Sequence, residues 1–243
     1  SRDFFGRRKD SYVQATHRPL NCLVFLLPLI VIYEIGSLTA HSLPLDTPSP
    51  PERVIAFYAI MRFLGLFATV PTYLPGLLLL VILALWHLAS EHRGRLRWTA
   101  VLGMAVESLL FCIPLLVLNR LVQMCVLAGG GGEFGLREQL VVAVTAGIYE
   151  ELIFRLLLIW IFKVVLVDVL ELPKAGSMAA IVLATAGMFA GYHYLGAERF
   201  AWTTFLFRTA AGALLGMVYV LRGFGITVGT HALYDVIVTL WMI

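Results

Sequence analysis

The chain has 243 residues, of which 60% are hydrophobic and only 14% are charged. Soluble domains are roughly 45–50% apolar and about 25% charged, so this composition excludes an ordinary soluble domain. The net charge of +3 is small, and its basic clusters lack interleaved aromatic residues, which excludes a nucleic-acid partner. We expect an all-α, polytopic integral membrane helix bundle with about seven to eight transmembrane or interfacial helices.

The N-terminal part, residues 1–136, is predicted to hold membrane helices behind a basic start. Hydrophobic runs predict spans at 20–40, 70–90 and 98–118, with a short interfacial helix at 54–69. The basic loop 91–97 and the basic start would share one side of the membrane, opposite the Pro-rich, slightly acidic loop 41–53. The positive-inside bias therefore predicts a cytoplasmic N-terminus.

The second part, residues 137–243, is expected to continue the same membrane domain after a loop of four glycines at 129–132. Its hydrophobic runs predict four further spans, at 137–162, 177–195, 200–221 and 224–243. Gly212 and Gly216 lie four residues apart in one of these spans, a spacing that suits close packing of helices. No separate soluble domain is expected.

Two adjacent acids and an arginine, Glu150, Glu151 and Arg155, interrupt the expected span 137–162. An ionised carboxylate near the bilayer centre costs at least roughly 2.5–3.5 kcal/mol, so such groups usually face an interior and have a task. Glu151 and Arg155 are four residues apart and can pair on one helix face, whereas Glu150 is rotated by about 100°. One acid would therefore be structural, and the other free to act as a general base or acid.

His193, His231 and Asp235 place further polar groups in the later spans. His231 and Asp235 share a helix face, and together with Glu150 and His193 they could converge in the bundle core. Such a group can activate water directly or hold a divalent metal that does so. If the two helices started level, His193 would lie about ten residues, or about 15 Å, deeper than His231. A shared site therefore requires a broken or offset helix.

These residues form three motifs in a fixed order. They read EExxxR at Glu150–Arg155, FxxxH at Phe189–His193 and HxxxD at His231–Asp235, each inside an expected span. In this pattern the sequence resembles the CPBP intramembrane proteases, the family of the prenyl-protein CaaX endopeptidase and its bacterial relatives. The resemblance covers roughly residues 137–240, and the fragment Gly212-x-x-x-Gly216 also fits it.

The resemblance implies an endopeptidase in a bacterial cell membrane that cleaves a membrane-associated peptide or protein, which can be lipid-modified. It implies that Glu150 and His193 activate water, and that His231 and the residue at position 235 stabilise the tetrahedral oxyanion. Three further residues are implied to be structural: Glu151, Arg155 and Phe189.

Position 235 separates two versions of this mechanism. Asparagine, the family's other choice there, can donate a hydrogen bond to an oxyanion, whereas ionised Asp235 only accepts one. An alternative interpretation makes four residues ligands of a divalent metal such as zinc: Glu150, His193, His231 and Asp235. The cation Arg155, four residues after the acids, disfavours a nearby metal, so we expect water activation without a cofactor.

Two classes of protein outside the hydrolases also place ionisable groups inside a membrane. A proton-coupled carrier could use the same glutamate, histidine and arginine side chains as a relay. A membrane scaffold could keep them only as structural pairs. The sequence lacks the internal repeat that many carriers show, and a protease is therefore the favoured prediction.

Overall fold

The computed structural model describes residues 11–39, 54–66, 74–90, 96–125, 135–196 and 198–241. Within these ranges the chain is helical and has no strand, which confirms the predicted all-α class. Among the described residues, five helices are long and apolar enough to cross a membrane, namely α2, α5, α8, α9 and α10. The protein is thus an integral membrane helix bundle.

The described residues of the N-terminal part form five helices: α1 Tyr12–Thr16, α2 Pro19–Thr39, α3 Ile55–Gly65, α4 Leu74–Ala89 and α5 Trp98–Cys125. The sequence reasoning missed α1, whose first turn is capped by the Ser11 side chain accepting from the Gln14 N–H. It also ended the third span too early, at 118. The helix continues past Arg120 to Cys125, and the exposed Arg120 guanidinium lies 4.9 Å from the centroid of the Trp241 ring.

Several predicted features fall outside the described residues. They are the basic start, the loop 41–53, the four-glycine loop 129–132 and most of the basic loop 91–97. The cytoplasmic placement of the N-terminus depends on these segments and stays a prediction. The division of the chain at residue 136 also stays a prediction.

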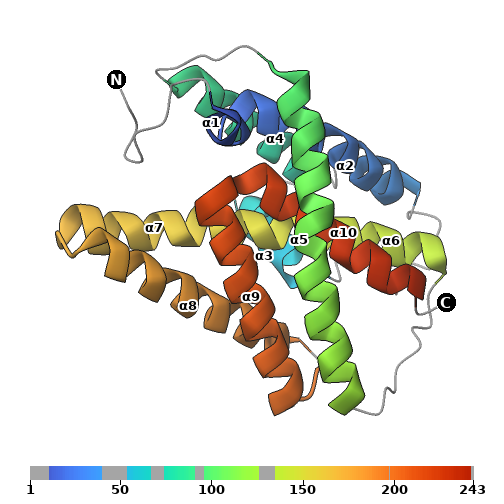
Figure 1. The fold of residues 1–243 in the computed structure, drawn as a ribbon. Helices are drawn as coiled ribbons and strands as arrows, with labels where there is room; N and C mark the ends of the chain where they lie inside the picture. Colours follow the sequence, from blue (N-terminus) through green and yellow to red (C-terminus); the bar gives the residue numbers. More distant parts are fainter. Residues whose placement is uncertain are drawn as a thin grey trace.

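The helical segment that carries the paired acids is longer and less regular than predicted. It runs from α6 (Leu136–Glu151) through a π-helical stretch, η3 (Leu152–Leu158), into α7 (Ile159–Lys163) and a second π-helical stretch, η4 (Val164–Val169). In Figure 1 these pieces form one rod that crosses the molecule. The change from α to π winding comes directly after Glu151, and π-helical turns are frequent at functional sites.

The chain then returns along the rod as α8 (Lys174–Tyr192), which ends in a single 3₁₀ turn, η5 (His193–Leu195). The α9 helix (Trp202–Arg222) packs against α8 through the two predicted glycines. A Cβ added at Gly212 would lie 3.2 Å from the Cα of Ala186, and one at Gly216 would lie 3.0 Å from Val182 Cγ1. The predicted close packing at this glycine pair is therefore present.

The last helix, α10 (Phe224–Trp241), follows α9 after only one residue, Gly223. Gly223 has a φ of 93°, a left-handed conformation that glycine adopts without a steric penalty. The α10 helix packs against α5 and α6, and in Figure 1 it passes across α5 and lies beside α6. Where α10 contacts α6, a Cβ on Gly147 would lie 2.7 Å from the backbone nitrogen of Ala232, so the two backbones almost touch. This close approach brings the acids of α6 next to His231.

Candidate active site

Three helices bring the predicted polar residues into one cluster. Glu150 is near the C-terminal end of α6, His193 follows the last residue of α8, and His231 is in the first half of α10. The Glu150 Oε1 atom lies 3.9 Å from His193 Nε2, and its Oε2 atom lies 3.8 Å from His231 Nε2. The depth mismatch expected for level helices is therefore absent. The helices are offset, so the end of α8 meets the first half of α10.

The orientation of the His193 ring is fixed by its own helix. Its Nδ1–H donates to the carbonyl oxygen of Phe189 at 2.8 Å, because a carbonyl can only accept. The Phe189 ring also packs edge-on against the imidazole, with a centroid separation of 5.0 Å. In the neutral ring the Nε2 atom then carries a lone pair directed at the Glu150 side. His193 is thus held as a proton acceptor.

Glu151 contacts His231 as well as its predicted partner Arg155. The predicted ion pair is present, with 3.0 Å between Arg155 Nη1 and Glu151 Oε1. The same Oε1 atom also accepts a hydrogen bond from His231 Nδ1 at 2.7 Å. Arg155 in turn donates from Nη2 to the Gly212 carbonyl at 3.1 Å, and its guanidinium lies 4.5 Å from the Phe189 ring centroid. This network ties the acids of α6 to α8, α9 and α10.

His231 is surrounded by carboxylates. Its Nδ1 donates to Glu151, and its Nε2 lies 3.4 Å from Asp235 Oδ2 and 3.8 Å from Glu150 Oε2. Ionised carboxylates only accept hydrogen bonds, so both ring nitrogens gain by carrying a proton. The three nearby carboxylates together carry three negative charges. Arg155 and a protonated His231 supply two positive charges, which leaves the cluster with a net charge of −1. The arrangement therefore favours His231 as an imidazolium.

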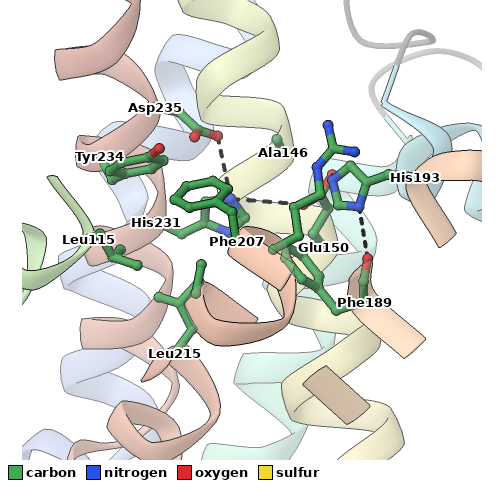
Figure 2. A pocket seen from close by; sticks show the side chains of 12 residues that line it. Leu115, Ala146, Glu150, Phe189, His193, Phe207, Leu215, His231, Tyr234 and Asp235 are labelled. Atoms are coloured by element: carbon green, nitrogen blue, oxygen red, sulfur yellow. Dashed lines mark hydrogen bonds and ion pairs between the residues drawn. The ribbon is translucent and has the colours of Figure 1, made fainter. Parts of the chain in front are cut away.

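The four predicted catalytic residues line one pocket of about 230 Å³. Figure 2 shows the His231 ring between Asp235 and Glu150, with His193 beyond Glu150. The rest of the wall is mainly apolar and comes from α5, α6, α8, α9 and α10; its members are Leu115, Ala146, Phe189, Phe207, Ala211, Leu215 and Tyr234. Arg208 also lines the pocket and forms an ion pair with Glu198 at 2.8 Å. The structure thus combines a polar cluster with an apolar wall.

Sequence reasoning missed one residue of the cluster, Tyr192. The Tyr192 hydroxyl donates a hydrogen bond to Glu150 Oε1, the same atom that faces His193 Nε2. A signal was available, because Tyr192 directly precedes His193 and places a hydroxyl inside an otherwise apolar span. Its direction toward Glu150 depends on how α8 packs against α6, which the sequence pattern does not contain.

The alternative that the same residues bind a metal can be compared with their arrangement. Both Nε2 atoms and both carboxylates face one pocket, but no group of three or more His, Cys, Asp or Glu side chains among the described residues is placed to hold a metal ion. Water activation without a cofactor therefore stays a prediction.

Comparison with known proteins supplies an independent finding. Residues 132–237 match the family model described as type II CAAX prenyl endopeptidase, Rce1-like. This range contains all three motifs, and the match confirms the resemblance read from them. Comparisons with curated proteins and with solved structures give no match. Over residues 132–237 the chain is thus similar to the Rce1-like family of type II CAAX prenyl endopeptidases.

Proposed function

We propose that this membrane protease hydrolyses a peptide bond with a water molecule activated between Glu150 and His193. The observation that carries the proposal is the position of the Glu150 carboxylate, which lies 3.9 Å from one imidazole Nε2 and 3.8 Å from the other. These separations are too long for direct hydrogen bonds, and a separation of this length is one that a water molecule can bridge. The site therefore offers a water two proton acceptors, Glu150 and His193.

The proton transfers follow from the hydrogen bonds of the two bases. The Nδ1–H of His193 is engaged by the Phe189 carbonyl, so a neutral His193 can accept a proton only at Nε2. Glu150 is buried, and its carboxylate accepts from Tyr192. The water oxygen attacks the carbonyl carbon while its proton passes to this pair, and the same proton then reaches the leaving amine. General acid–base transfer of this kind contributes about 10²–10⁴-fold to a rate.

The other side of the pocket suits the negative charge of the tetrahedral intermediate. A charged His231 can direct its Nε2–H to the oxyanion, while Glu151 holds the ring by Nδ1. Asp235 lies 3.4 Å from the same Nε2 atom and, when ionised, cannot donate to the oxyanion itself. We therefore assign Asp235 the task of holding His231 in its protonated form. Preorganised donors of this kind stabilise transition states strongly in low-dielectric sites.

The apolar wall suits a peptide substrate that reaches the site from the membrane. Leu115, Phe207 and Leu215 line the pocket beside the polar cluster. A hydrophobic side chain next to the cleaved bond would therefore find apolar contacts there. A membrane-associated peptide or protein is the substrate class we propose, and a lipid-modified one is included. A lipid attached to it would lie against the exposed hydrophobic surface of the helices, in contact with the bilayer.

Cleavage of a quenched fluorescent peptide library by the purified chain in detergent tests this function. We expect cleavage that a strong chelator leaves unchanged, because neither base needs a metal in the mechanism above. Loss of activity with chelator, restored by added zinc, would instead support the alternative in which Glu150, His193 and His231 are ligands. Absence of any cleavage, for peptides with and without a lipid, would contradict the proposed activity.

The close contact of α6 and α10 leads to a second expected result. Gly147→Ala adds a methyl group that would lie 2.7 Å from the Ala232 backbone nitrogen, so the helices must separate. Separation moves Glu151 away from His231, and a misplacement of about 1 Å can lower a rate by about 10²-fold. We expect a loss of that size in kcat/KM for peptide cleavage.

The matched control is Gly187→Ala on α8, where the added Cβ has no neighbour within 4 Å. This variant should keep its activity and fold at least as stably as the wild type, because alanine is the better helix former. Equal activity of the two variants would show that the α6–α10 contact does not control the site.

A further inference from the structure

Tyr192 contacts the centre of the site without lining the pocket. It is the last residue of α8, and its hydroxyl donates to Glu150 Oε1. That oxygen also faces His193 Nε2 at 3.9 Å. The phenol thus occupies one of the roughly four acceptor positions of the carboxylate, and the other three remain for water and a protonated His231.

The ring of Tyr192 is held on several sides, so its hydroxyl has a fixed direction. Its centroid lies 4.9 Å from that of Phe154 in η3, 6.1 Å from that of Phe189 and 4.4 Å from that of His193. Aromatic contacts of this kind keep the side chain in place. The Glu150 carboxylate is therefore fixed by a group that belongs to a different helix.

We propose that Tyr192 is a positioning residue that orients the Glu150 carboxylate, and this inference rests on the proposed function. A hydrogen bond donated to a carboxylate favours its charged form. The charged form is the one that accepts a proton from water, so the phenol keeps the base active at lower pH. Because Tyr192 is absent from the pocket wall, it acts through Glu150 and not through contact with the substrate.

The first test combines kinetics with infrared titration of Tyr192→Phe. Removing a hydrogen bond to a charged group should move the acidic limb of the kcat/KM profile to higher pH by about one unit. We expect kcat to fall about tenfold at neutral pH, with KM little changed. In the infrared titration the carboxyl band that Glu150→Gln removes should protonate at a correspondingly higher pH. This readout needs no substrate.

A matched control and a variant of opposite effect separate positioning from packing. Tyr219→Phe removes the hydroxyl of a partly buried tyrosine on α9 that packs against the main core and does not line the pocket. It should leave both profiles unchanged. Incorporation of 3,5-difluorotyrosine at position 192 keeps the ring and makes the phenol a stronger donor, so it should move the acidic limb to lower pH. A purely structural role predicts no such opposite shifts.

The outcomes distinguish this inference from the proposed function. If the wild type cleaves peptides and Tyr192→Phe has the same pH profile and infrared titration as Tyr219→Phe, the role of Tyr192 is wrong and the protease mechanism stands. If no peptide is cleaved, the proposed function fails, and the infrared titration still decides whether the Tyr192 hydroxyl acts on the Glu150 carboxylate.

Discussion

Replacing Glu150 by glutamine is expected to lower kcat/KM for peptide cleavage by about 10²–10⁴-fold. Glutamine has nearly the same shape, but its amide cannot accept a proton from water. Glu150 is buried and lies between His193 and His231, and no other described carboxylate faces both imidazoles in this way. Initial rates of the purified variant with one defined peptide measure the effect.

Glu34→Gln is the matched control for this substitution. Glu34 is also a glutamate inside an apolar helix, but it lies on α2 beside Gly76 and does not line the pocket. Its replacement should change the rate by less than about threefold, because Glu34 is remote from the reacting atoms. If Glu150→Gln and Glu34→Gln cleave the peptide at similar rates, Glu150 is not the base.

Replacing Arg155 by methionine is expected to destabilise the folded protein by about 3–5 kcal/mol. Arg155 and Glu151 form a pair whose side chains are only 1% and 0% exposed. Removing Arg155 takes away one of the two cations that contact the buried Glu151 carboxylate, and the Gly212 carbonyl also loses its donor. His231 then remains the only cation that contacts Glu151 among the described residues. Thermal or denaturant unfolding in detergent measures the loss.

Two companion variants identify the cause of that loss. Arg62→Met removes an exposed arginine on α3, and we expect a change within about 0.5 kcal/mol. Arg155→Lys keeps the charge, but one ammonium group cannot reproduce the planar pair of contacts to Glu151 and Gly212, so it should recover only part of the stability. A stability of Arg155→Met equal to that of Arg62→Met would show that the buried pair does not stabilise the fold.

The motif spacing predicted that Glu150 and Glu151 have different roles, but it did not predict all of their hydrogen-bond partners. The interval between Glu151 and Arg155 predicted the ion pair, because both residues belong to the same helical segment. The hydrogen bond from His231 to Glu151 spans 80 residues of sequence and depends on how closely α10 packs against α6. Helical periodicity contains no information on such packing. The contact between Tyr192 and Glu150 escaped prediction for the same reason.

Helix ends and offsets were the least predictable part of the fold. Hydrophobic runs located the membrane helices, since apolar composition determines which segments can enter a bilayer. They did not predict that the rod would continue to Val169, nor that it would change to π winding after Glu151. The offset that a shared site required for His193 and His231 is present, but its size could not be predicted from the sequence, because packing between helices sets it.

Cleavage of one membrane-anchored peptide in H₂¹⁸O, followed by mass spectrometry, tests most directly whether Glu150 activates water for peptide hydrolysis. The wild type should yield two fragments whose masses sum to the substrate plus one water, with a single ¹⁸O in the new carboxylate. Glu150→Gln should leave the peptide intact over the same time. An intact peptide with the wild type, or equal labelled fragments with Glu150→Gln, would contradict the mechanism.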